Sequence, residues 1–258
     1  MAKTYSLWAS VVRIMATLLI FLFHYEGLYK RSLAPFDMVA ITMFLLISGY
    51  FSCQHDTSIH KWFIKRLKQI LIPYWPIIIF VLLVNHFINY KPTTAFNNVM
   101  IFSGLSYFIK DPVYVIAWFI TLILIFYIDL YLFRLIKFLL WKIVFFVMSY
   151  MIICFYFHVS AVYFFSFYLG YYLRYKNTFA FEPRLIQRLG LEKMNQALFQ
   201  TQSYCYAFFL LHGGMLLFII KVCKLPEGYS LTAAFLLTFL SAYVYKNLID
   251  RLIRKIPI

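Results

Sequence analysis

Negative charge is scarce in this chain of 258 residues, which has 9 Asp and Glu against 24 Lys and Arg. Glycine and proline are also few, with 8 of each. No linker rich in Gly, Ser or Pro and no internal repeat is visible, so the sequence predicts a single domain over residues 1–258. The 4 cysteines form no CxxC pair or cysteine–histidine cluster, which argues against a disulfide framework and a zinc site.

Several motifs of soluble enzymes are missing as well. The sequence contains no GxSxG, GxxxxGK, GxGxxG or HExxH pattern, so hydrolase, ATPase and metalloprotease functions lose their usual signatures. The formal net charge of +15 is not gathered into a separate basic domain. Because Lys and Arg lie between apolar runs, we expect no nucleic-acid partner.

Apolar residues are present in excess. Hydrophobic residues make up 64% of the chain, charged residues 13%, and the mean hydropathy is +0.80. A bilayer solvates such a surface directly, whereas a soluble core would leave much of it in water. Since a spanning helix needs about 20 mostly apolar residues, the sequence predicts an all-α, polytopic transmembrane helix bundle. The eight predicted spans are 7–28, 36–54, 70–90, 113–133, 138–157, 159–175, 204–222 and 229–249.

The segment 96–108 is moderately apolar but contains Asn97 and Asn98. We interpret it as part of an outer loop with an interfacial segment. Two other loops, 55–69 and 176–203, are long enough to cover a cytoplasmic entrance. The second contains Leu185, Leu189 and Leu191 among charges, a pattern typical of an interfacial helix.

The basic residues support this count of spans. With the N-terminus inside, loops rich in Lys and Arg alternate with loops that have few, as the positive-inside rule requires. The predicted external segments contain Lys30, Arg31, Lys91, Lys110, Lys221 and Lys224. Both termini are therefore predicted to be cytoplasmic. Arg13 interrupts the first apolar run and no cleavage site follows, so we expect a retained helix and not a signal peptide.

Arg13 and His24 are ionisable residues within the first predicted span, where such side chains are expensive and are functional candidates. Their separation of 11 positions corresponds to about three helical turns and about 16.5 Å of rise, which places them on one face. Ala16, Thr17 and Ile20 lie between them, as expected for the wall of a buried channel for a thin ligand. Alternatively, Arg13 extends towards the cytoplasmic headgroups and His24 lies near the opposite interface.

His212 is the third ionisable residue that stands out within a predicted span. It is followed by Gly213 and Gly214, which would allow close approach of a helix or a ligand. The alternative interpretation is a hydrogen-bonded packing residue.

Seven sequence segments, in this order, are similar to motifs of the acyltransferase 3 family of bacterial integral-membrane enzymes. They are VVRIMATLLIFLFHY from Val11, MFLLISGYF from Met43, FIKRLKQILIPYW from Phe63, AWFITLILIFY from Ala117, FYLGYYL from Phe167, SYCYAFFLLH from Ser203 and YVYKNLIDR from Tyr243. Gln69 replaces one of two family arginines, Asp250 replaces a glutamate, and Thr121–Ile123 replace a carboxylate-containing segment. The family also includes members with about ten spans.

The resemblance implies transfer of an acetyl or other short acyl group from acyl-CoA to a hydroxyl of a surface polysaccharide, glycolipid or similar acceptor. It implies His24 as the catalytic base, since imidazole titrates near neutral pH. The implied acyl-CoA-binding residues are Arg13, Lys65, Arg66 and Lys68, and the implied substrate-positioning residues are Ser48, Tyr74, Trp118 and His212.

The family resemblance also implies a bacterial cytoplasmic membrane, lipid as a partner, acyl-CoA as co-substrate and no permanently bound cofactor. Two alternatives remain open at this point. A transporter or exporter of a glycan or acylated lipid would use the same polar helix faces without making a bond. A structural or sensor protein would explain the hydrophobicity but not Arg13 and His24 on one face.

Overall fold

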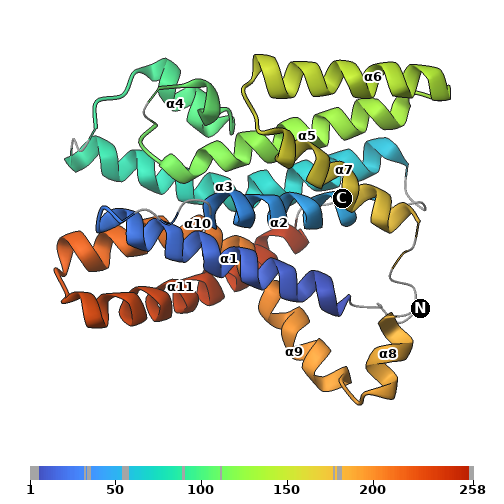
Figure 1. Cartoon of the computed structure of the whole chain (residues 1–258). Helices are drawn as coiled ribbons and strands as arrows, with labels where there is room; N and C mark the ends of the chain where they lie inside the picture. Colours follow the sequence, from blue (N-terminus) through green and yellow to red (C-terminus); the bar gives the residue numbers. More distant parts are fainter. Residues whose placement is uncertain are drawn as a thin grey trace. The chain divides into compact units, whose positions relative to one another are not determined.

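The computed structural model describes residues 6–31, 33, 36–53, 58–88, 91–110, 112–176, 178 and 182–255, which form helices and turns with no strand among them. An all-α helix bundle is therefore confirmed (Figure 1). The chain divides into two compact units. The first comprises Met1–Cys53 and Ser160–Leu248, and the second comprises Gln54–Val159 and Ile249–Ile258.

The first unit is built around the N-terminal helix. Its elements are α1 (Leu7–Leu28), α2 (Phe36–Tyr50), α7 (Ala161–Tyr175), α8 (Glu182–Arg188), α9 (Glu192–Gln202), α10 (Cys205–Leu217) with a π-helical extension (Phe218–Val222), and α11 (Glu227–Lys255) as far as Leu248. Helix α1 contacts α2, α9 and α10. One hydrophobic cluster joins α1, α10 and α11 through Phe21, Phe208 and Ala234.

Small residues on one face of α11 allow this packing. Ser230, Ala234, Thr238 and Ala242 recur every fourth position, and each is 0% exposed. Side chains of this size let helix backbones approach closely in a membrane. The hydroxyl groups of Ser230 and Tyr25 lie 2.9 Å apart, so a polar contact also links α1 to α11.

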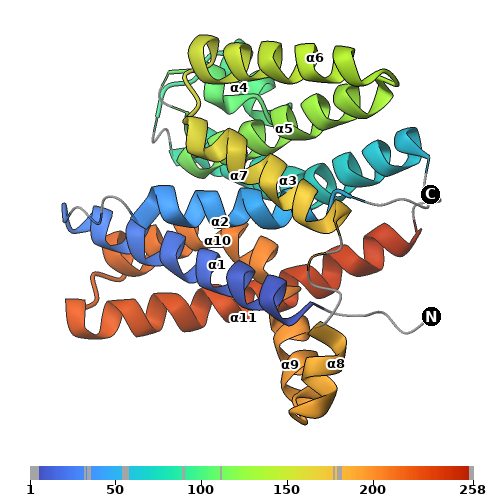
Figure 2. The ribbon, with the colours of Figure 1, turned by 45° about the vertical axis from the view of Figure 1, so that its right-hand side comes forward.

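Helices α2 and α7 cross at two glycines, and Figure 2 shows these helices side by side. A methyl group added to Gly49 would overlap the carbonyl oxygen of Phe167, and one added to Gly170 would overlap that of Leu46. Only glycine at both positions permits this backbone contact.

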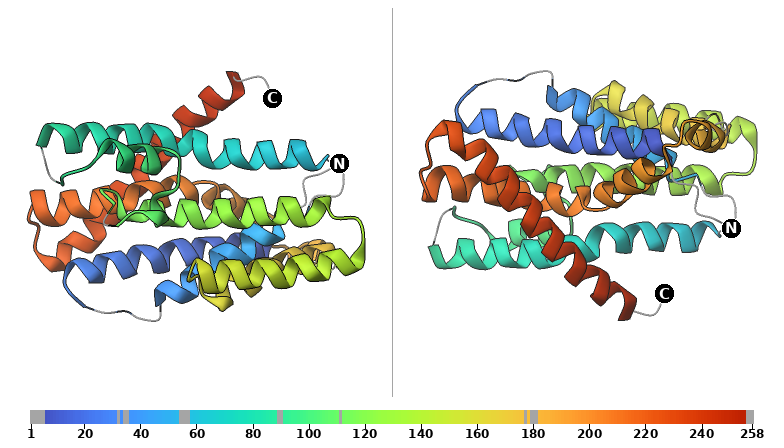
Figure 3. Two further views of the ribbon diagram at one scale, coloured as in Figure 1. Left: turned by 90° about the horizontal axis from the view of Figure 1, so that it is seen from above. Right: turned by 90° about the horizontal axis from the view of Figure 1, so that it is seen from below.

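The second unit contains α3 (Ile59–Ile88), α4 (Ala95–Phe102), α5 (Trp118–Leu135) and α6 (Leu139–Met151), which continues as a π-helix (Ile152–Tyr156). Figure 3 shows α5 and α6 running antiparallel, joined by a short connection. Hydrogen bonds from Tyr74 to the carbonyl of Ile101 (2.6 Å) and from Trp75 to that of Phe102 (3.1 Å) attach α4 to α3.

The predicted spans are found as helices, but they differ in length. The structure has 6 helices long and apolar enough to cross a membrane. The remaining two predicted spans are α2 and α7, of 15 residues each. That length gives about 22 Å of rise, less than the hydrocarbon core of about 30 Å. The chain is thus a multi-pass membrane protein, while the cytoplasmic placement of both termini stays a prediction.

One connecting segment differs from the predicted loop, and another contains short helical elements. Residues 59–69 are the beginning of α3 rather than a loop, because Ser58 caps the helix (Lys61 N–H to Ser58 Oγ, 3.3 Å) and no glycine or proline interrupts it before Pro73. The segment 96–108 contains α4 and a 3₁₀ turn (Ser106–Phe108). With 8 residues, α4 is too short to span a bilayer.

Helices α8 and α9 lie in the segment 176–203, of which residues 177 and 179–181 are outside the described residues, while the interfacial position of this segment stays a prediction. Residue 54 of the second predicted span, residues 89–90 of the third and residues 55–57 of the first cytoplasmic loop lie outside the described residues.

Candidate active site

The N-terminus of α1 is held by a carboxylate from α8. Glu182 accepts hydrogen bonds from the backbone N–H of Trp8 and from the hydroxyl of Ser6, each at 2.8 Å. Its side chain is buried, and a negative charge is favourable at a helix N-terminus because it pairs with otherwise unsatisfied N–H groups. This contact fixes the helix that carries Arg13 and His24.

Arg13 and His24 both lie on α1, as the sequence predicts, and both are half-buried. Between them, Ala16 is 0% exposed, and Thr17 and Ile20 are 5% exposed. This stretch of α1 is therefore covered by neighbouring helices of the same unit.

The structure brings His24 next to His212 of α10. The centroids of the two imidazole rings are 5.1 Å apart, and the ring planes are inclined by 46°. His212 is 0% exposed, and the rings of Phe21 and Phe209 lie 6.5 and 5.7 Å from it, measured between centroids. Two histidines from distant parts of the sequence thus lie side by side among aromatic rings.

A hydrogen bond fixes the tautomer of His212. Its Nδ1 lies 2.6 Å from the carbonyl oxygen of Phe209. A carbonyl oxygen can only accept, so Nδ1 carries the hydrogen and Nε2 of the neutral ring has a lone pair. This buried Nε2 has no hydrogen-bond partner among the residues that the structure describes. A buried acceptor without a partner is unfavourable and marks a position for an N–H or O–H donor.

Arg13 lies against the end of α2. Its guanidinium carbon is 5.0 Å from the centre of the Phe51 ring, a cation–π contact. Ser48, a predicted substrate-positioning residue, is half-buried on α2, and its carbonyl accepts a hydrogen bond from Ser52 (2.6 Å). Arg13, His24, Ser48 and His212 all belong to the first unit.

The predicted basic donor-binding residues Lys65, Arg66 and Lys68 belong to the second unit, on the first turns of α3. Lys65 is exposed, whereas Arg66 and Lys68 are half-exposed. The guanidinium carbon of Arg66 lies 5.9 Å from the centre of the Tyr127 ring, and its Nη1 donates to Gln69 at 3.2 Å. These three basic residues are therefore at least partly accessible on α3.

Tyr74 and Trp118 also belong to the second unit. Tyr74 is 0% exposed, and its hydroxyl donates to the carbonyl of Ile101, so its visible role is to join α3 to α4. Trp118 is the first residue of α5 and is half-buried. Their predicted substrate-positioning roles stay predictions.

The sequence motifs do not indicate the buried carboxylate that the structure shows in α5. Asp129 is 7% exposed and accepts a hydrogen bond of 2.5 Å from Ser149 of α6. The signal in the sequence is an acidic residue inside the predicted span 113–133, where an ionisable side chain is a functional candidate. Its contact with Ser149 ties the two helices of the hairpin together.

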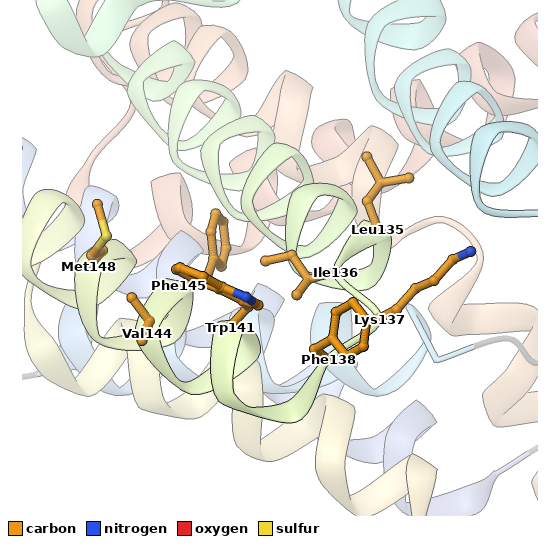
Figure 4. Close-up of a pocket in the computed structure, with 8 residues that line it drawn as sticks. All are labelled: Leu135, Ile136, Lys137, Phe138, Trp141, Val144, Phe145 and Met148. Carbon is orange, nitrogen blue, oxygen red and sulfur yellow. The ribbon is translucent and has the colours of Figure 1, made fainter.

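The second unit also has an open apolar groove of about 470 Å³ at the turn between α5 and α6 (Figure 4). It is lined by Phe138, Trp141 and Phe145 among others, with Lys137 the charged lining residue. None of the predicted site residues lines it. Within the described part of the chain, no group of three His, Cys, Asp or Glu side chains is arranged to hold a metal ion.

The helices and the histidine pair define a multi-pass membrane protein with a partly buried imidazole site. The chain belongs to the acyltransferase 3 family, whose model, described as an acyltransferase domain, matches residues 6–245. The resemblance found in the sequence motifs is thereby confirmed, and the chain is a membrane acyltransferase. Comparison with curated proteins and with solved structures finds no match.

Proposed function

We propose that this membrane acyltransferase moves an acetyl or other short acyl group from acyl-CoA to a hydroxyl of a surface polysaccharide, glycolipid or similar acceptor. The bacterial cytoplasmic membrane is its proposed location. The observation that carries the proposal is the pairing of His24 with His212, because it supplies a base and a group that orients it.

His24 acts as the general base in this proposal. One of its ring nitrogens takes the proton of the acceptor hydroxyl while the hydroxyl oxygen attacks the thioester carbon. The tetrahedral intermediate then collapses, the carbon–sulfur bond breaks, and the CoA sulfur receives the proton from the His24 imidazolium. The products are the O-acyl ester and CoA, with no net change in the enzyme. Lipid and packed helices limit access of water and therefore hydrolysis of the thioester.

His212 orients the base. Two imidazoles joined by an N–H···N hydrogen bond of about 3 Å have ring centroids about 5 Å apart, close to the 5.1 Å that separates these rings. After a small rotation of the His24 ring, the N–H group of this ring donates a hydrogen bond to Nε2 of His212. The buried Nε2 acceptor then has a partner. The other nitrogen of His24 then has its lone pair available for the acceptor hydroxyl.

The proposed role of the basic residues is to bind the phosphates of the acyl-CoA donor. Each of Arg13, Lys65, Arg66 and Lys68 is proposed as a phosphate-binding residue, since guanidinium and ammonium groups form strong charge-assisted hydrogen bonds with phosphate oxygens. Ser48, Tyr74 and Trp118 are proposed to position donor or acceptor.

A transfer assay tests the proposal directly. Membranes containing the wild type or His24→Ala receive radiolabelled acetyl-CoA, and labelled envelope glycans are quantified. We expect the substitution to reduce transfer by about 10²–10⁴-fold, the usual contribution of a general base. His86→Ala, which changes an exposed histidine at the end of α3, is the matched control and should remain active. Unchanged turnover by His24→Ala would remove the assigned role.

The same assay separates an enzyme from an exporter. An exporter would leave acetyl-CoA unused in the wild type while its deletion reduced the amount of glycan outside the cell. Mass spectrometry of surface glycans with and without the protein then identifies the acceptor, because an O-acetyl group adds a defined mass.

A further inference from the structure

A second arginine of the first unit lies at the same end of α2 as Arg13. Nη1 of Arg174, in the last turn of α7, donates to the Tyr50 hydroxyl at 3.2 Å, and its guanidinium carbon is 5.3 Å from the centre of the Tyr50 ring. The guanidinium group of Arg13 makes a cation–π contact with the ring of the neighbouring Phe51. Two adjacent aromatic residues therefore each hold one guanidinium group.

The position of Arg174 is built into the fold. Tyr50 is only 3% exposed, and the Trp8 ring packs edge-on against it with centroids 4.7 Å apart. Gly170 lies one helical turn before Arg174, where a methyl group would also approach the backbone nitrogen of Tyr50 to 2.9 Å. The glycine crossing thus fixes the turn of α7 from which Arg174 extends.

The guanidinium group of Arg174 is nevertheless accessible. Its side chain is exposed, and no described carboxylate forms an ion pair with it. The buried carboxylate of Glu182, on the next helix of the unit, is already engaged by Ser6 and Trp8. An arginine held by an aromatic ring keeps several N–H donors in a fixed plane, an arrangement suited to phosphate oxygens.

The predicted topology assigns this end of α1, α2 and α7 to the cytoplasmic side, where acyl-CoA is found. We propose that Arg174, oriented by Tyr50, binds a phosphate of the nucleotide part of acyl-CoA together with Arg13. This inference rests on the proposed function for its ligand. It adds a donor-binding residue that the sequence motifs did not indicate.

Kinetics with two donors test the assignment. Acetyl-CoA and acetyl-phosphopantetheine differ in the adenosine and its phosphates. In nanodiscs of neutral lipid, we expect Arg174→Gln to raise the KM for acetyl-CoA about tenfold with little change in kcat, the signature of lost ground-state binding. The KM for acetyl-phosphopantetheine should change less than twofold, on the order of a surface substitution. Tyr50→Phe retains the ring and should give a smaller rise.

Arg188→Gln is the matched control, because Arg188 is an exposed arginine of the same unit on α8; it should behave as the wild type. An equal rise in KM for both donors would overturn the assignment, since the lost contact would not be to the nucleotide. So would an effect of Arg174→Gln that occurs only with anionic lipid, because the bound phosphate would then belong to a lipid headgroup.

A binding experiment with 3′,5′-ADP separates this inference from the proposed reaction. The wild type and Arg188→Gln should bind this nucleotide in neutral nanodiscs, and Arg174→Gln should bind it about tenfold more weakly, as expected for one lost charge-assisted contact. Equal binding by all three proteins would overturn the inference. A third outcome is that only Arg174→Gln binds 3′,5′-ADP more weakly while the wild type transfers no acyl group. This outcome would support the nucleotide site and contradict the proposed function.

Discussion

The Nε2 atom of His212 is buried beside the imidazole of His24 and lacks a hydrogen-bond partner among the described residues, while its Nδ1 is bonded to the carbonyl of Phe209. In the proposed reaction, this relationship gives the two histidines unequal roles. His212 has one nitrogen committed to the backbone, whereas His24 is half-buried and can face a substrate. An orienting residue and a reacting base are therefore distinguishable by experiment.

Replacement of His212 should affect kcat more than KM. We expect His212→Ala to lower kcat about 10–100-fold, as is typical when a residue that orients a functional group is lost, with the KM for acetyl-CoA nearly unchanged. His212→Gly leaves a cavity, and added imidazole should restore part of its activity. A mutant that is inactive but folded, and that imidazole does not rescue, would contradict the orienting role.

Substitution at the α2–α7 crossing should destabilise the protein. Gly49→Ala and Gly170→Ala each place a methyl group against a backbone carbonyl, which cannot move aside as a side chain can. We expect a loss of about 1–3 kcal/mol, the usual range for overpacking, measured as a lower midpoint of thermal unfolding in detergent. Gly27→Ala is the control, because no atom lies within 4 Å of its added methyl group. An equal decrease in the unfolding midpoint for all three substitutions would contradict the close contact of α2 with α7 at the two glycines.

The Asp129–Ser149 hydrogen bond should couple α5 to α6. We expect Ser149→Ala to destabilise the protein by about 1–3 kcal/mol, because the buried carboxylate loses a donor. A double-mutant cycle with Asp129→Asn should show a coupling energy of about 0.5–2 kcal/mol. Additive effects of the two substitutions in denaturation would show that the contact does not stabilise the hairpin.

Loss of the Glu182 carboxylate should loosen the start of α1. We expect Glu182→Ala to reduce stability by about 1 kcal/mol, comparable to loss of an N-cap, and to speed amide hydrogen exchange in residues 7–10. Glu192→Ala, which removes an exposed carboxylate from the first turn of α9, should leave this exchange unchanged. Protection of residues 7–10 that persists in Glu182→Ala would contradict the capping role.

Much of the fold follows from the sequence because apolar length and helical periodicity are local properties. The positions of Arg13 and His24 on one helix depend only on their spacing, and the structure places both on α1. The prediction for the start of α3 is wrong for a local reason as well. A run of Lys and Arg favours a loop, but no residue in 59–69 breaks a helix, and the structure has α3 there.

The contacts between helices could not be predicted in the same way. The proximity of His212 to His24, of Arg174 to Tyr50 and of Gly49 to α7 depends on which helices pack together. The periodicity of apolar residues identifies the buried face of a helix but not the helix that packs against it. Asp129 had a usable signal in its position within a predicted span, but its partner Ser149 became known only from the structure.

The α2–α7 contact also bears on how the chain enters the membrane during synthesis. Gly49 and its partner helix are separated by about 120 residues of sequence, which a ribosome adds in about 6–24 s at about 5–20 residues per second. Until α7 emerges, the glycine face of α2 has lipid, a neighbouring helix or an insertion factor beside it instead of its final partner. Completion of the first unit is therefore a late event, because α2 has no contact with α7 while the second unit is being made.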